Sequence, residues 1–252
     1  MKVLSIAQVT LKEALRRRLQ VNLLLFALLL LAGSSVASLL TVGYTHRIAA
    51  DLGLTAMEVM GSLTAVFLGA GLIAGDVERR VVYPLVAKPV SRAQYLLGRY
   101  LGLGATLWLN MAVMAATLAA LLCWDAGSLA PIDHALLSAF FMMGVQFLVV
   151  AAVAVLFSCI TTPTLAAIFS LAVTIAGHLS NDLRTLWEGA GSGVGKALWY
   201  VLPNLSALSL NAEVIYRVAP PASAWLASAY ALLYAGAVLA LAAAAFERRD
   251  FR

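Results

Sequence analysis

The chain has 252 residues, of which 63% are hydrophobic and only 12% are charged, and its formal net charge is +5. This charged fraction is about half that of an ordinary soluble domain, so the composition predicts an integral membrane protein and not a soluble one. The positive charge follows from membrane orientation and gives no reason to expect a nucleic-acid partner.

Residues 1–18 are predicted to form an amphipathic helix on the inner membrane surface. Five apolar side chains share one helical stripe: Leu4, Ala7, Leu11, Ala14 and Leu15. This spacing is typical of an amphipathic helix, and the arginines at 16–18 then lie at the level of the phospholipid headgroups. A solvated basic tail is the alternative.

Six uncharged apolar runs follow. Crossing a hydrocarbon core of roughly 30 Å takes about 20 apolar residues, and the candidate runs are 19–42, 59–73, 100–122, 135–157, 165–179 and 224–246. Backbone polar groups in lipid must pair within their own segment, so these runs predict transmembrane helices. They lack the alternation that strands of a β-barrel need. A signal peptide cleaved near residues 36–38 is the alternative for the first run, which is too long for that purpose.

The distribution of Lys and Arg places both termini in the cytoplasm. With this orientation, all but four of the 17 basic residues lie on the inner side. The outer loops hold Arg47, Arg184, Lys196 and Arg217, together with acidic residues that include Glu58. This asymmetry obeys the positive-inside rule and predicts a multi-pass membrane protein with its basic side facing the cytoplasm.

The predicted spans hold almost no charge, and their polar exceptions are Asn110, Gln146 and His178. Ion- or proton-coupled transport commonly needs a membrane-buried charge, so energy for transport is expected to enter from elsewhere. We interpret His178 as a hydrogen-bonded structural residue. No HExxH or GxSxG spacing occurs, and we predict neither a catalytic residue nor a metal site on this chain.

Residues 181–223 form a long outer segment. Trp187, Trp199 and Tyr200 favour the boundary between water and lipid, so we expect short helices resting on the outer leaflet. Residues 191–197 read GSGVGKA, which lacks the first glycine and the final hydroxyl of a phosphate-binding loop. We interpret them as a turn.

Two pairs of glycines have the small-xxx-small spacing that lets helices approach closely: Gly71 with Gly75, and Gly98 with Gly102. Packing within one subunit and a seam between two subunits both fit this pattern. Cys123 and Cys159 fall at opposite membrane faces in the predicted topology, so they are not expected to pair.

Residues 75–99 form a charged insert between apolar runs. Pro84 and Pro89 interrupt it and break its middle into a short helix and a bend. A short, rigid, charged piece between two spans predicts a docking surface for another protein.

The insert resembles the cytoplasmic loop of permeases in type-2 ATP-binding-cassette exporters. The similarity lies in Glu78, Pro84, the run KPVSR at 88–92 and the run YLLGR at 95–99. It extends to the link SCITTP at 158–163 and to the ending FERRDF at 246–251. The chain departs from the family pattern at Arg80-Val81, which replace a Gly-Thr pair, and at Arg99, which replaces a lysine.

This resemblance implies a coupling helix that docks on a separate cytoplasmic ATPase subunit. It assigns the ATPase contact to Asp76, Glu78, Arg79, Arg80, Pro84, Lys88, Pro89, Ser91 and Arg92, and a smaller second contact to Ser158, Thr161 and Thr162. ATP and magnesium would bind to the ATPase partner, and this chain would hold no cofactor. The alternative for residues 76–80 is capping of a helix at the headgroup level.

The resemblance also implies that residues 1–252 form one permease domain, which pairs with a second copy or a related permease and exports or rearranges a substrate. A periplasmic partner is compatible with it. Two other functions stay open, namely a secondary transporter or channel, and a membrane anchor that transports nothing itself.

Overall fold

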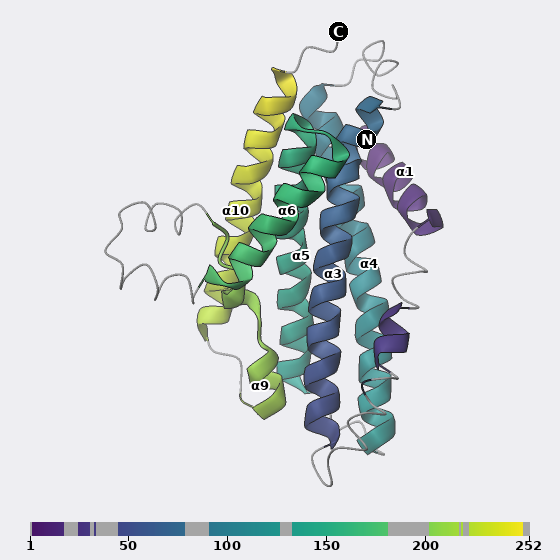
Figure 1. The fold of residues 1–252 in the computed structure, drawn as a ribbon, viewed down its shortest axis with the longest axis vertical. Coiled ribbons are helices and arrows are strands. Elements are labelled where there is room, and N and C mark those ends of the chain that lie inside the picture. Colours follow the sequence, from purple (N-terminus) through teal and green to yellow (C-terminus); the bar gives the residue numbers. More distant parts are fainter. Residues whose placement is uncertain are drawn as a thin grey trace, which may run out of the picture.

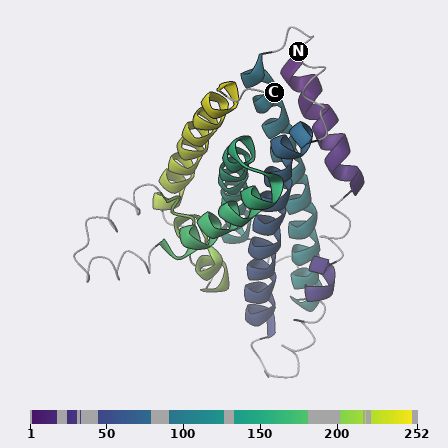
Figure 2. The ribbon, with the colours of Figure 1, turned by 45° about the horizontal axis from the view of Figure 1, so that its top comes forward.

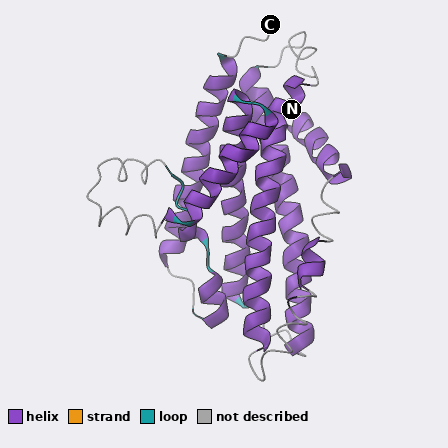
Figure 3. Cartoon of the chain, in the orientation of Figure 1, coloured by secondary structure: helices purple, strands orange, loops and turns teal. Residues whose placement is uncertain are grey.

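The computed structural model describes residues 2–17, 25–30, 33, 45–78, 91–126, 133–180, 202–216, 218 and 222–248. This part of the chain is helical and contains no strand (Figure 3), which confirms the predicted all-α class for it. The elements are α1 (Lys2–Arg17), α3 (Thr45–Glu78), α4 (Arg92–Ala126), α5 (His134–Ile160), α6 (Pro163–His178), η2 (Ser206–Leu208), α9 (Asn211–Tyr216) and α10 (Ala222–Glu247).

The helix α5 forms the centre of an elongated bundle. It contacts α3, α4, α6 and α10, and Figure 1 shows these helices around it. Most of its residues are buried, as expected for a helix that is apolar all round. Ring contacts join the neighbours: Phe141 of α5 lies 5.9 Å from Trp108 of α4 and 5.7 Å from Trp225 of α10, measured between ring centroids.

Within the described part of the chain, four helices are long and apolar enough to cross a membrane, over residues 47–78, 92–124, 134–160 and 223–247. They correspond to the second, third, fourth and sixth predicted runs. The fifth run matches α6, whose 16 residues span roughly 24 Å at 1.5 Å per residue. Of the first run, the structure describes only residues 25–30 and 33.

Two predicted boundaries are wrong. The helix α3 has 34 residues and begins at Thr45, where the sequence predicted an outer loop that included Glu58. The helix α4 begins at Arg92, well before the predicted start at residue 100. Both predictions ended a span where a charged side chain occurs, but Glu58 and Arg99 are buried among polar partners inside the bundle.

The helix α1 lies beside α4 at an angle to the bundle (Figures 1 and 2). A Cβ atom added at Gly98 would lie 2.9 Å from Ile6 Cβ, and one added at Gly102 would lie 2.6 Å from the Ala7 carbonyl oxygen. The pair Gly98 and Gly102 therefore packs within the subunit, as one of the two interpretations expected.

The predicted helix over residues 1–18 corresponds to α1. Leu4 of its predicted apolar stripe is 66% exposed, as a side chain facing the lipid would be, and Thr10 is buried against α4. The other glycine pair differs from the first, because a Cβ added at Gly71 or Gly75 would meet no described atom within 4 Å. The described structure has no disulfide bond between Cys123 and Cys159.

Candidate functional site

The charged insert is flanked by well-defined helix ends. Glu78, the last residue of α3, is exposed, and the next described residue is Ser91. Its Oγ accepts a hydrogen bond from the Gln94 amide at 3.2 Å, and Gln94 Oε1 accepts one from the Ser91 amide at 3.3 Å. This reciprocal capping box starts α4 directly after the insert.

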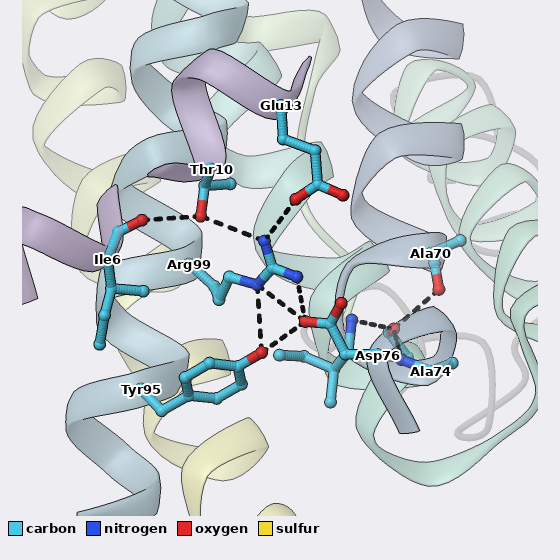
Figure 4. Close-up of polar contacts among 10 residues, drawn as sticks. Ile6, Thr10, Glu13, Ala70, Ala74, Asp76, Tyr95 and Arg99 are labelled. Carbon is cyan, nitrogen blue, oxygen red and sulfur yellow. Dashed lines mark hydrogen bonds and ion pairs between the residues drawn. The ribbon is translucent and has the colours of Figure 1, made fainter. Parts of the chain in front are cut away.

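A buried ion pair joins α3 to α4 beside the insert (Figure 4). Arg99 of α4 donates to Asp76 Oδ2 of α3 from Nε at 2.8 Å and also from Nη2. Tyr95, one turn earlier in α4, donates its hydroxyl to the same oxygen. The side chains of Arg99 and Asp76 are only 9% and 10% exposed. Each buried charge therefore needs the other, and the pair holds the two helices together.

The same arginine also reaches α1. Its Nη1 donates to Glu13 Oε2 at 3.1 Å and to Thr10 Oγ1 at 3.3 Å. Figure 4 shows Arg99 between these two side chains of α1 and Asp76 of α3. We call Thr10, Glu13, Asp76, Tyr95 and Arg99 the inner brace, because they join three helices at the base of the insert.

Arg92 ties the start of α4 to the end of α10. Its Nη1 donates to the carbonyl oxygens of Phe246 at 3.3 Å and Glu247 at 2.9 Å. The last carbonyl groups of a helix lack partners within the helix, and a cation there also interacts favourably with the helix dipole. The helices α1, α3, α4 and α10 are thus connected at the end of the bundle that carries the insert (Figure 1).

Ser158, near the end of α5, inserts its hydroxyl group into α3. Its Oγ donates to the Ala70 carbonyl oxygen at 2.7 Å and accepts from the amides of Ile73 at 3.1 Å and Ala74 at 2.9 Å. Ala70 and Ala74, both labelled in Figure 4, would bond to each other in a regular α-helix. The hydroxyl group of Ser158 therefore ties α5 to the turn of α3 that precedes Asp76.

The structure separates the predicted ATPase-contact residues into two groups. Asp76 and Ser158 are buried and bonded inside the bundle, an arrangement that suits a positioning role, and their contact with a partner stays a prediction. Glu78, Ser91 and Thr162 are exposed, while Arg92 and Thr161 are partly buried. The remaining predicted contact residues lie outside the described part of the chain, namely Arg79, Arg80, Pro84, Lys88 and Pro89.

A second polar cluster lies in the middle of the bundle. Glu58 Oε1 accepts from Gln146 Nε2 of α5 at 3.1 Å and lies 3.2 Å from His178 Nε2 of α6. Its other carboxylate oxygen accepts from Asn211 Nδ2 at 3.1 Å and from Ser209 Oγ at 3.4 Å. We call these five residues the Glu58 cluster. It joins α3, α5 and α6 to residues 209–211 of the outer segment.

The Glu58 cluster overturns the prediction that the spans are nearly free of charge. His178 is hydrogen-bonded, as expected, but it is not isolated. Sequence reasoning had noted Gln146 and His178 singly, and two polar side chains in apolar runs are themselves a signal, because buried polar groups need partners. Glu58 was missed because its charge had been taken as the end of a loop.

Within the described residues, no group of three or more His, Cys, Asp or Glu side chains could hold a metal ion. The Glu58 cluster contains one carboxylate and one histidine, and the inner brace contains two carboxylates and a guanidinium. Both arrangements suit hydrogen bonding and ion pairing between helices.

Comparison with known proteins supplies the family. The family model described as ABC-2 family transporter protein matches residues 5–251, which is nearly the whole chain. Comparison with curated proteins gave no match. The match agrees with the resemblance of the insert, and it includes the inner brace and the Glu58 cluster. The chain belongs to the ABC-2 transporter family, as the permease subunit of an ATP-binding-cassette transporter.

Proposed function

We propose that this permease couples ATP hydrolysis by a separate cytoplasmic ATPase subunit to the export or rearrangement of a substrate across the inner membrane. The observation that carries the proposal is the inner brace, in which Arg99 bonds to Asp76 of α3 and Glu13 of α1. It joins three helices where the charged insert begins and ends.

A docking element transmits movement only if its base does not give way. Asp76 lies two residues before Glu78, the last residue of α3, and Ser91 caps the first turn of α4. Both ends of the insert are therefore held by side-chain hydrogen bonds. A push on the insert would move α3 and α4 together and carry α1 with them.

In this proposal, residues 79–90 dock on the ATPase, with Glu78 and Arg80 making polar contacts and Pro84 and Pro89 stiffening the element. Two permeases, either identical or related, each receive one ATPase. Closure of the ATPases around nucleotide then shifts the bundle between two packed states. Thr161 and Thr162, at the turn between α5 and α6, provide a smaller second contact.

Charge reversal tests the coupling. The chain is purified with its candidate ATPase partner and reconstituted, and both co-purification and ATP turnover are measured for Glu78→Arg and Arg80→Glu. We expect association or turnover to fall at least about tenfold, which corresponds to about 1.4 kcal/mol. The matched control is Glu213→Arg on α9, in the predicted outer segment, which should leave both quantities unchanged. Unaltered assembly and turnover in both insert variants would show that the insert does not couple the two subunits.

A further inference from the structure

The bonding of His178 fixes one of its ring hydrogens. Nδ1 lies 2.9 Å from the Thr174 carbonyl oxygen, which only accepts, so Nδ1 carries a hydrogen. In a neutral ring the lone pair is then on Nε2. This nitrogen lies 3.2 Å from Glu58 Oε1 and 2.9 Å from Gln146 Nε2.

An ionised Glu58 beside a neutral His178 would place two acceptors in contact. One proton between Glu58 Oε1 and His178 Nε2 converts this repulsion into a hydrogen bond. When the proton resides on Glu58, its hydroxyl group donates to the single lone pair of His178 Nε2. When the proton resides on His178, Nε2 donates to Glu58 Oε1. In both states Gln146 Nε2 donates to Glu58 Oε1 at 3.1 Å.

We infer that Glu58 and His178 form a proton-binding site inside the bundle, which holds one proton between Oε1 and Nε2 and thereby fastens α6 to α3. The ligand is a proton, taken from water and returned to it with no other reactant. The inference goes beyond ATP coupling and does not depend on it.

The two members of the site differ in exposure. Glu58 lies close to the midpoint of the 34-residue α3, roughly 5 Å away along the helix axis. Its side chain is 10% exposed, whereas that of His178, the last residue of α6, is 32% exposed. The histidine is therefore the more accessible member of the pair.

The titratable groups at the site are few. Among the described residues that bond to Glu58 or His178, the other side chains are the neutral Gln146, Ser209 and Asn211. The next carboxylates are Glu213 on α9 and Asp51 earlier on α3, and neither bonds to the pair in the described structure.

The number of protons on the Glu58–His178 pair determines whether the hydrogen bond between Oε1 and Nε2 forms. With no proton, the Glu58 carboxylate faces the lone pair of His178. With two protons, both groups carry a hydrogen and only one can be donated between them. The contact between α3 and α6 is therefore strongest in a window of intermediate pH and weaker on either side, as expected for a coupled pair.

Infrared difference spectroscopy of the purified full-length chain between pH steps tests the site. We expect a protonated-carboxyl stretching band that titrates, disappears in Glu58→Gln and persists in the control Glu213→Gln. In His178→Gln, the midpoint of this band should shift by about one pH unit or more, because a coupled ionisable neighbour is lost.

A thermal-unfolding series over the same pH range gives a second readout. The wild-type midpoint temperature should peak at intermediate pH, and the profile should flatten in Glu58→Gln and His178→Gln. If Glu58→Gln does not fold, the shift in the midpoint of the carboxyl band in His178→Gln tests the proton-binding site by itself. Two results would overturn the proton-binding site: a spectrum that titrates identically in wild type and Glu58→Gln, or a Glu58 band whose midpoint is the same in His178→Gln. Neither result would bear on ATP coupling.

Discussion

At the scale of single residues, the permease relies on a few buried polar side chains that bond to neighbouring helices. Arg99 bonds to Asp76 and Glu13, and Ser158 bonds to three backbone groups of α3. A buried ion pair contributes little net stability compared with apolar packing, but removing one partner is costly because the other charge stays buried. These side chains therefore specify the arrangement of the helices.

The ion pair gives the first prediction. Asp76→Ala should lower the free energy of unfolding of the purified chain by about 3 kcal/mol, because Arg99 loses its buried counter-charge. Thermal or denaturant unfolding measures the change. Glu13→Ala removes the other acidic partner of the same arginine, but this side chain is 54% exposed, so the loss should stay below about 1 kcal/mol. Equal losses in the two variants would contradict the brace.

A double-mutant cycle separates pairing from general damage. If Asp76 and Arg99 act as a pair, Asp76→Ala combined with Arg99→Met should cost clearly less than the sum of the single changes. Strictly additive losses would mean that the two side chains stabilise the protein independently.

Ser158 gives the second prediction. Ser158→Ala removes a hydroxyl group that serves three backbone groups of α3, and it should cost about 1–3 kcal/mol in the free energy of unfolding. The matched control is Ser170→Ala on α6, which is equally buried but bonds only to the Ala166 carbonyl of its own helix. That carbonyl keeps its ordinary helical partner, so the control should lose much less. A larger loss in the control would refute the role of Ser158.

At the scale of helices, two glycines of α4 determine where α1 lies, because they have no side chain to keep the two helices apart. Gly98 and Gly102 face the backbone of α1 at distances that leave no room for a Cβ atom. This contact lets Glu13 and Thr10 reach Arg99, so the glycines position one side of the inner brace.

The third prediction tests this contact. Gly102→Ala would place its Cβ 2.6 Å from both the Ala7 carbonyl oxygen and Thr10 Cβ, and it should destabilise the chain by about 1–3 kcal/mol in an unfolding experiment. Gly236→Ala on α10, where nothing lies within 4 Å, should be neutral or stabilising by up to about 1 kcal/mol, since alanine is the better helix former. Similar effects at both sites would argue against tight packing of α1.

Sequence reasoning worked best for helices without internal charge. The predicted run 135–157 matches α5, and the run 224–246 matches α10, each within a few residues. It failed at α3 and α4, where Glu58 and Arg99 were taken as limits of a span. A charge is tolerated inside a bundle when a partner from another helix meets it, and pairing across more than 20 residues leaves no local pattern in the sequence.

At the scale of the whole molecule, α3 carries both polar sites. Asp76 connects it to α4 and α1 near the insert, whereas Glu58 connects it to α5, α6 and the outer segment. A displacement of α3 at one site is therefore felt at the other through a single continuous helix. This arrangement suits a protein in which movement at one end of the bundle must reach its middle.

The family and the general architecture could be predicted from the order of elements along the chain, and the family match confirms that prediction. The orientation of the side chains of Asp76 and Ser158 could not be predicted in this way. Asp76 and Ser158 were grouped with the insert and the turn because they are neighbours in sequence, but a helix rotates successive side chains by 100° and turns both of these inward.

The central claim is that residues 79–90 touch the ATPase on the cytoplasmic side. The most direct measurement places a photo-cross-linking amino acid at Pro84 in the intact complex and, as a control, at the exposed Ala207 of the outer segment. The account predicts a cross-link to the ATPase subunit from position 84 and none from position 207. A cross-link from position 207, or reaction of position 84 only with reagents added outside the membrane, would contradict it.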